Sequence, residues 1–490
     1  MTLNRREFLK KTALGTTLAA AGAPMVGNRA FAMTPPLFQD KSGISFVGSA
    51  ATGTRRAMIA GVLEPWRAAV AAGIGGKTIL IKVNMVYWNT AIADPGLSLT
   101  HVDAVRGLLD FLRTINAAAP VVIGDCTANS GANGDILRMF ARLGYDLLTK
   151  EYTGVSLADL NTLPSTDRPF WTTSFSASST VAIPVIGAFT DSKYYVISIC
   201  RPKTHNNVVM TGVNKNILMG APLHSGTADG VGVVPKQFMH GQNGWFDGMH
   251  ADENKCLSYN MFQMANVIYA TGTPALSILD AWEGMEGDGP TGGTSVMQYC
   301  AVSGIDPLAV DRISAKLMGF SDTATEPMNK ATPSYTDMRV LVWISNAGFG
   351  NYDLSKINFI HGSITDVEKY VKQYKMSSLY TGEPSYETNW TGGPPEVIPM
   401  PYLVPQVRRA ITGDVIINFT LPVNARVRLG IFNLQGAEVN RLGDEFLPAG
   451  RYTMVWDGCN ARGARVGAGM YVIKLNFGSR AICDQVTMVR

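Results

Sequence analysis

The feature that most constrains the fold is an alternation of short apolar strands and amphipathic helices along most of the chain. Residues 77–84 read KTILIKVN, a short β-branched run that is typical of a strand buried on both faces of a parallel sheet. Residues 101–115 follow with apolar side chains at helical spacing, and residues 119–126, APVVIGDC, form a second apolar run. This order predicts a strand–helix–strand unit with both strands in one sheet.

The same alternation continues downstream. Helical spacing is found at residues 134–148 and 308–319, and strand-like runs at 194–200 and 275–282. We therefore predict an α/β fold with an open, mostly parallel sheet and helices on both faces. Such sheets carry their sites beyond the carboxyl ends of the strands, which singles out Asp125 and residues 201–205 and 280–290.

The composition changes after residue 378. Residues 379–404 are rich in Pro, Gly and Thr without apolar periodicity, which predicts a linker between an α/β domain at 33–378 and a separate domain at 405–490. The last segment alternates short strands with turns and predicts a small antiparallel β-sandwich. Its stretches FTLP, AGRYTMVWDG and GMYVIKL resemble the immunoglobulin-like domain of flagellar hook-capping proteins. That resemblance implies a non-catalytic module, which could dock to the cell envelope or to a protein partner.

Residues 1–32 have the three regions of an export signal: a basic start, a modest apolar run and Ala-Phe-Ala at the end. Arg5-Arg6 followed by Phe8 and Leu9 resembles the twin-arginine signal, which the twin-arginine export machinery recognises. We expect a periplasmic or secreted protein that is exported already folded. The apolar run is too short for a membrane span, so we expect no transmembrane anchor in the mature chain.

Charge and cysteine content exclude several classes. The formal net charge of +4 lies within residues 1–32, so the remainder is nominally neutral and offers no electrostatic case for nucleic-acid binding. The six cysteines are scattered and form no C-x-x-C pair, which argues against an iron–sulfur cluster and against a zinc ribbon. Cys459 and Cys483 could form a disulfide in an oxidising compartment. G-x-S-x-G, Walker A and G-x-G-x-x-G motifs are missing after the predicted strands, which weakens serine-hydrolase and nucleotide-dependent interpretations.

Basic and amide side chains gather just beyond the strand at 194–200. The stretch RPKTHNNVVMTGVNKNILMG supplies Arg201, Lys203, His205, Lys215 and Asn216. Cations and amides at the mouth of an apolar sheet are suited to a carboxylate or a phosphate, whereas a solvated polar loop is the alternative.

Lys82 is unusual within a strand that otherwise appears buried. We therefore expect it to emerge at the end of that strand, near Asp125 and the same crevice.

Carboxylates follow the strand at 275–282 in the sequence AWEGMEGDGPTGG. We expect a glycine-dense loop in which Glu286 and Asp288 bind a divalent metal ion or act as a base, and an acidic turn without a ligand is the alternative. Four histidines also fall in one window with Asp229, Asp247 and Asp252, namely His205, His224, His240 and His250. A metal site and a lid over the crevice are the two interpretations of this window.

The blocks IKVN, IGD, ISICRPKTH, TGVNKNILMG, ILDAWEGMEGDGP and GIDPLAVDRISAKLMG resemble, in that order, those of the family named domain of unknown function 362, over roughly residues 45 to 330. The resemblance implies an α/β domain but no activity. Many members carry ferredoxin-like cysteine clusters, which this sequence lacks. The family's recurrent polar positions correspond to Lys203, His205, Lys215, Asn216, Glu286, Asp288, Gly289, Asp306 and Asp311. Of these, Asp306 precedes Pro307 as an expected helix N-cap, and Asp311 is expected to be a first-turn partner of the helix dipole.

The leading hypothesis is an exported enzyme that acts on a small anionic ligand, with a divalent metal as the conceivable cofactor. The expected catalytic residues are His205, Lys203 and Glu286, and the expected metal ligands are Glu286 and Asp288. The expected ligand-binding residues are Lys82, Asp125, Arg201, Lys215, Asn216 and Gly289. The alternative is a non-catalytic ligand-binding or assembly protein whose sandwich docks to the envelope or a partner. The substrate and the reaction stay open.

Overall fold

The computed structural model describes residues 32–34, 36–38, 40–48, 53–85, 95–126, 135–171, 180–205, 208–224, 235–240, 251–290, 292–320, 339–377, 402–407, 414–421, 424–477 and 480–489. The chain divides into two compact units. The α/β unit consists mainly of Asp40–Val342 and Gly350–Glu396, and the sandwich unit mainly of Val397–Arg490 with Trp343–Phe349 and residues near position 32. The expected signal peptide, apart from Ala32, and almost all of the expected linker lie outside the described residues.

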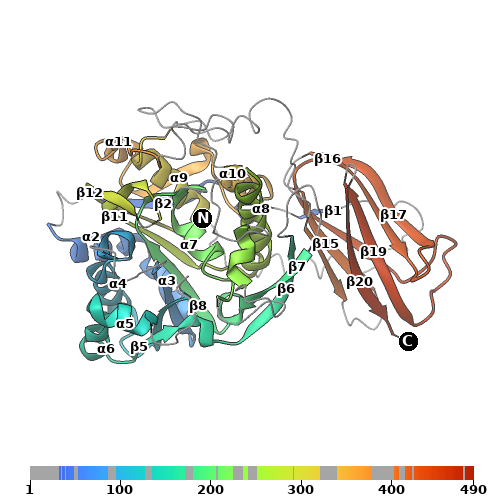
Figure 1. Ribbon diagram of the computed structural model, residues 1–490, viewed down its shortest axis with the longest axis horizontal. Coiled ribbons are helices and arrows are strands. Elements are labelled where there is room, and N and C mark those ends of the chain that lie inside the picture. The colour runs from blue at the N-terminus through green and yellow to red at the C-terminus, as the bar shows by residue number, and fades with distance from the viewer. Residues whose placement is uncertain are drawn as a thin grey trace. The chain divides into compact units, whose positions relative to one another are not determined.

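A large mixed sheet forms the centre of the α/β unit (Figure 1). Neighbouring pairs are parallel except where β12 lies between β11 and β2, so the predicted mostly parallel sheet is confirmed. The strand order is β13 (Ile357–His361), β2 (Ser42–Gly48), β12 (Gly292–Gly304), β11 (Leu276–Asp288), β8 (Tyr194–Cys200), β3 (Thr78–Lys82), β4 (Val121–Asp125) and β5 (Val155–Asp159).

Successive residues of the central strands enter two different cores, which is the physical basis of their continuous apolar sequence. In β8, Ile199 belongs to one apolar cluster and Cys200 to the other; in β11, Ile278 and Leu279 divide in the same way. The first cluster takes side chains from α2 (Arg55–Leu63), α3 (Arg67–Ile74), α4 (Val102–Ile115) and α5 (Asp135–Arg142). The second takes them from α7 (Val213–Leu218), α9 (Pro307–Leu317) and α11 (Ile364–Glu368).

Shorter elements complete this unit. β9 (Lys203–His205) pairs with β10 (Val209–Thr211) and continues the direction of β8, while β6 (Ser165–Trp171) and β7 (Thr180–Ile186) form a separate antiparallel pair. The remaining helices are α6 (Leu148–Glu151), α8 (Ala251–Ile268) and α10 (Arg339–Asn346), of which α10 spans the boundary between the units.

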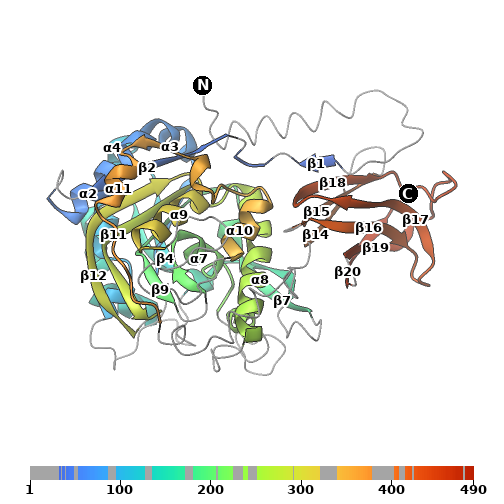
Figure 2. The same ribbon diagram turned by 90° about the horizontal axis from the view of Figure 1, so that it is seen from above.

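The sandwich unit has two antiparallel four-stranded sheets, as the sequence predicted (Figure 2). Their inward residues, including the fully buried Trp456, form one apolar core. One sheet has the order β1 (Ala32–Thr34), β18 (Gly450–Trp456), β15 (Val415–Leu421) and β14 (Tyr402–Val407). The other has the order β17 (Glu438–Leu447), β16 (Ala425–Phe432), β19 (Gly469–Phe477) and β20 (Arg480–Met488). Among the described cysteines no disulfide forms, and Cys459 and Cys483 are not joined.

Within the described part of the chain, one helical stretch, Arg55–Ile74, is long and apolar enough by composition to cross a membrane. Met58 and Val70, on its two α-helices, belong to the core of the α/β unit.

Candidate functional site

The site is built where β3 and β4 end side by side. Lys82 is the last residue of β3, and Asp125 is the last residue of β4. The Lys82 Nζ lies 2.6 Å from the Asp125 Oδ1, and both side chains are almost completely buried. Asp125 also accepts hydrogen bonds from the backbone N–H groups of Met85 and Cys126. A lysine thus reaches the end of its strand as predicted, but it is ion-paired inside the protein rather than open to a crevice.

A chain of hydrogen bonds extends from Lys82 to the next strand ends. Lys82 donates to the Asn216 Oδ1 at 3.0 Å, and the Asn84 Nδ2 donates to the same oxygen at 3.2 Å. The Asn84 Oδ1 in turn accepts from the Lys203 Nζ at 2.8 Å, and Lys203 also donates to the Ser98 carbonyl at 2.5 Å. Each of these side chains is at most 8% exposed. The structure therefore joins three predicted site residues, Lys82, Asn216 and Lys203, in one buried network.

Gly220 makes room for this network at the end of the TGVNKNILMG stretch. A Cβ at Gly220 would lie 2.2 Å from the Lys82 Cε and 2.4 Å from the Asn216 carbonyl oxygen. The glycine is explained by this close approach of a lysine and a helix backbone.

Four buried lysines, Lys82, Lys203, Lys215 and Lys236, make up a basic centre. Lys215, on α7, is the one of them whose ammonium has no hydrogen-bond or ion-pair acceptor among the described residues, although its side chain is only 8% exposed. Burial, followed by the nearby positive charges of Lys236 and Lys82, lowers its pKa to about 7. Burial, followed by the charge of Lys215, likewise lowers the pKa of Lys203 to about 7. Both lysines can therefore exchange a proton near neutral pH, which an ordinary exposed lysine cannot.

Lys236 is a member of this centre that the sequence analysis missed. It lies in the 3₁₀ helix η7 (Pro235–His240), is 4% exposed, and donates to both the Sγ (2.8 Å) and the carbonyl oxygen of Cys126. A single lysine within a segment of turn-forming residues carries no periodic or motif signal, so the sequence offered nothing to mark it.

Three histidines of the predicted window are buried in the same region. His205 is 3% and His240 6% exposed. Burial first, and then the charge of Lys215, lowers the pKa of His205 far below its ordinary value and that of His240 to about 3. Burial, and then Lys236, lowers the pKa of His224 to about 3. These imidazoles are therefore neutral at neutral pH.

Among the described residues, no group of three or more His, Cys, Asp or Glu side chains is placed to hold a metal ion. These residues therefore give no support to the interpretation of the window as a metal site. His250, Asp229 and Asp247 lie outside the described residues, as do most of the segments expected to form a lid.

Asp311 holds the start of α7. Its carboxylate accepts from the backbone N–H groups of Val213 and Asn214, at 2.7 and 3.0 Å, and from the Asn214 Nδ2 at 2.7 Å. Burial raises the pKa of Asp311 to about 6, against the lowering effect of these hydrogen bonds. We expected Asp311 to interact with the dipole of its own helix, α9. That expectation is wrong, because its carboxylate oxygens accept hydrogen bonds from a different helix, α7. Asp306, in contrast, caps α9 as predicted.

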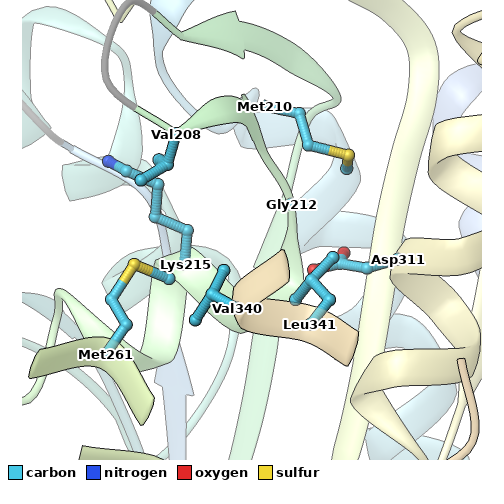
Figure 3. Close-up of a pocket in the computed structure, with 8 residues that line it drawn as sticks. All are labelled: Val208, Met210, Gly212, Lys215, Met261, Asp311, Val340 and Leu341. Atoms are coloured by element: carbon cyan, nitrogen blue, oxygen red, sulfur yellow. The ribbon is translucent and has the colours of Figure 1, made fainter. Parts of the chain in front are cut away.

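Lys215 and Asp311 line a small pocket whose other walls are apolar. In Figure 3 the Lys215 nitrogen and the Asp311 carboxylate lie on opposite sides of this pocket. The remaining lining residues are Val208, Met210, Gly212, Met261, Val340 and Leu341. Val209 lies between Val208 and Met210 in the sequence and has a φ of +64°, which is a strained value for a β-branched residue.

Arg201 belongs to a separate ionic cluster. Its guanidinium lies 3.1 Å from the Glu283 Oε2, and Arg55 lies 3.4 Å from both Glu283 and the fully buried Asp280. Two guanidiniums thus face two carboxylates, so Arg201 contributes a balanced pair rather than an excess positive charge.

The prediction that Glu286 and Asp288 lie in an acidic loop is wrong. β11 continues through Asp288 and pairs with β12, so Glu286 and Asp288 lie on a long hairpin. Glu286 accepts from the backbone N–H of Lys375, and Asp288 from the Ser377 hydroxyl, each at 2.8 Å. These carboxylates therefore hold residues 375–377 against the hairpin.

Gly289, at the tip of the same hairpin, packs against backbone. A Cβ at Gly289 would lie 1.8 Å from the Thr204 carbonyl oxygen, so this position requires glycine for packing.

Two family models match the chain, one within each of its two units. The model described as Domain of unknown function (DUF362) matches residues 79–316, and the model described as FlgD Ig-like domain matches residues 405–479. No curated protein matches the sequence.

Three similar solved structures each match less than a fifth of this chain. Dimeric latent PorU from Porphyromonas gingivalis is 15% identical with a TM-score of 0.17, and the match covers 18% of this chain and 9% of PorU. FlgD from P. aeruginosa is 19% identical with a TM-score of 0.15, and the match covers 18% of this chain and 72% of FlgD. PorZ of the type-IX secretion system of P. gingivalis is 14% identical with a TM-score of 0.12, and the match covers 15% of this chain and 9% of PorZ.

Proposed function

We propose that this chain, whose residues 79–316 form a domain of the family described as Domain of unknown function (DUF362), binds a small anionic substrate at the buried basic centre formed by Lys82, Lys203, Lys215 and Lys236. The observation that carries the proposal is Lys215, a buried ammonium beside other lysines without an acceptor among the described residues.

Charge balance supports this assignment. A buried charge is costly unless an opposite charge or hydrogen bonds compensate it. Asp125 is committed to Lys82, and Asp311 to the first N–H groups of α7. A carboxylate or phosphate bound near Lys215 would supply the missing negative charge, and Lys203 and Lys236 would add to its attraction.

The same groups suit proton transfer. A side chain that gains and loses a proton near neutral pH is an efficient general acid or base, and the pKa of Lys203 is about 7. His205, which is buried near Lys215, is neutral at that pH and therefore adds no positive charge to the centre. We therefore favour an enzyme over a passive carrier.

Anion binding by the purified full-length protein tests the proposal. Isothermal titration calorimetry with sodium sulfate and sodium phosphate should give saturable binding, which Lys215→Met should weaken by about tenfold or more, as expected for the loss of a charge-assisted contact. Lys369→Met removes an exposed lysine at the end of α11 and is the matched control, expected to bind as the wild type does. Absence of binding by the wild type, or equal binding by Lys215→Met, would refute the site.

We further propose that residues 1–32 direct export by the twin-arginine route. Arg5→Lys with Arg6→Lys should retain the protein in the cytoplasmic fraction of a host that has this pathway, while the wild type reaches the periplasm. Retention of both proteins, or export of both, would contradict this route.

A second candidate role concerns the sandwich unit, and the FlgD Ig-like match at residues 405–479 favours it. Phe446 on β17 is 71% and Leu434 63% exposed, so both large apolar side chains are open to contact by a partner surface. If the sandwich docks to an envelope protein, Phe446→Asp should release the full-length chain from the membrane fraction, and Val489→Asp, which changes an equally exposed residue near the end of the chain, serves as its control. A wild type that is never membrane-associated would exclude docking.

A further inference from the structure

Two adjacent residues at the end of β4 each hold one lysine of the basic centre. Asp125 holds Lys82 with a carboxylate, so the charge of that ammonium is balanced inside the protein. Cys126, the next residue, holds Lys236: its sulfur accepts a hydrogen bond from the Lys236 Nζ at 2.8 Å, and its carbonyl oxygen accepts from the same nitrogen. Both of these acceptors are uncharged as long as the thiol keeps its proton.

We propose that Cys126 is a positioning residue of the anion site, whose thiol keeps the Lys236 ammonium inside the basic centre without neutralising its charge. This inference rests on the proposed function and adds a residue to the same site. Cys126 acts through Lys236 and needs no contact of its own with the anion. Lys236 in turn lies close enough to Lys215 for its charge to act on that ammonium.

The hydrogen bonds of the thiol leave its sulfur able to accept from Lys236. A thiol carries one proton, which it donates weakly, and its sulfur is also a weak acceptor. The Cys126 Sγ lies 2.7 Å from the Gly220 carbonyl oxygen, to which it donates. The proton is therefore used on the side of Gly220, and the lone pairs of the sulfur remain for the Lys236 ammonium.

The same thiol links the segments that carry two of the lysines. Gly220 lies just beyond the end of α7, which carries Lys215, and Lys236 belongs to η7. Cys126 belongs to neither segment, since it directly follows β4. One side chain that is 2% exposed thus contacts both segments, and it constrains where the charge of Lys236 lies relative to Lys215.

The charge of Lys236 has no counter-ion in the part of the chain that the structure describes. No Asp or Glu side chain there forms an ion pair with Lys236, in contrast to the pair of Lys82 and Asp125. Burial raises the pKa of the Cys126 thiol, although the charge of Lys236 acts in the opposite direction. The thiol therefore stays protonated at neutral pH, so no thiolate balances the ammonium, and a bound anion can do so.

Sulfate binding by variants of the full-length protein, measured by isothermal titration calorimetry, tests the inference. Lys236→Met should weaken binding by about tenfold, as expected for the loss of a charge-assisted contact. Cys126→Ala should weaken it by about threefold or more, because Lys236 loses its sulfur acceptor. Cys126→Ser retains a group that both donates and accepts, so it should restore most of the affinity that Cys126→Ala loses.

Cys300→Ala is the matched control. It shortens another fully buried cysteine of the same sheet, whose thiol donates to the Ala281 carbonyl at 3.8 Å rather than to a group of the basic centre. We expect this variant to bind sulfate as the wild type does.

Combining the two substitutions separates positioning from a general loss of structure. Cys126→Ala should change the affinity of Lys236→Met by less than about twofold, because both substitutions act through the same ammonium. If Cys126→Ala does not fold, Cys126→Val takes its place in both backgrounds.

The same titrations distinguish failure of this inference from failure of the proposed function. An equal loss of affinity in both backgrounds, wild-type affinity of Cys126→Ala, or wild-type affinity of Lys236→Met overturns the positioning role of Cys126. The anion site itself then stands as long as Lys215→Met weakens binding. Absence of sulfate binding by the wild type removes both proposals.

Discussion

The Lys82 ammonium and the Asp125 carboxylate lie 2.6 Å apart at the carboxyl ends of two adjacent parallel strands, and both are almost completely buried. This pair fixes one side of the basic centre, because Lys82 also hydrogen-bonds Asn216 on α7. Because Asp125 balances the charge of Lys82, this pair adds no net charge to the basic centre. Any net positive charge of the centre therefore comes from Lys203, Lys215 and Lys236.

Lys82→Met should destabilise the protein strongly, because Asp125 would remain as a buried carboxylate without its cation. Removal of one partner from a buried ion pair typically costs about 3–5 kcal/mol in the free energy of unfolding. The double variant Lys82→Met with Asp125→Leu should recover part of that loss, as measured by urea denaturation. Equal stability of Lys82→Met and the wild type would show that the pair does not form.

Gly220→Ala should disturb the same network by steric overlap. The new Cβ would fall 2.2 Å from the Lys82 Cε, which forces either the lysine or α7 to move, and we expect a loss of about 1–3 kcal/mol as for other overpacked positions. Gly76→Ala is the matched control, because a Cβ there meets nothing within 4 Å. The prediction fails if both variants unfold at the same denaturant concentration.

Asp311→Ala should loosen the start of α7. The backbone N–H groups of Val213 and Asn214 would lose their acceptor inside the protein, at about 1–3 kcal/mol for an unsatisfied buried group. Hydrogen exchange at these two amides should accelerate more than exchange in the sandwich unit, which provides the internal reference. Unchanged protection of both amides would contradict the capping role.

The stability of the protein should rise with pH above neutrality because of Lys203 and Lys215. Their folded-state pKa values of about 7 lie below the ordinary 10.5, so between these values the unfolded chain binds more protons. The cost of burying the ammonium groups is complete below about pH 7 and is relieved as the pH rises toward 10.5.

Lys215→Met isolates one of these contributions. The variant should be more stable than the wild type at about pH 6, and the difference should shrink toward about pH 10, as measured by urea denaturation at each pH. A constant difference across this range would show that Lys215 does not titrate as its surroundings imply.

Much of the fold could be predicted because its signals are local. The apolar run at residues 194–200 predicted a strand buried on both faces, and the structure places Ile199 and Cys200 in two different cores. The hairpin formed by β11 and β12 was missed, because the glycines and carboxylates of residues 281–293 resemble a loop when their cross-strand partners are unknown.

The site was predicted in part for a related reason. Strand ends carry a topological rule, which singled out Asp125 and Lys203, and Lys82 was singled out as a lysine within an apolar strand; the structure places all three in one buried network. Whether a charged residue is neutralised depends on distant partners, so the sequence could not show that Arg201 pairs with Glu283 or that Asp311 caps α7. Lys236 entered the centre from a segment without periodicity, and only the folded chain shows its contact with Cys126.

The most direct test of the central claim is the pH dependence of sulfate binding to the full-length protein. Sulfate keeps its charge near neutral pH, so a change in its affinity reports on the protein's own groups. Calorimetric titrations should show saturable binding at about pH 6 that weakens as the pH rises past about 7 to about 9, because Lys203 and Lys215 lose their protons in this range. No binding at about pH 6, or the same affinity across the range, would contradict an anion site formed by these lysines.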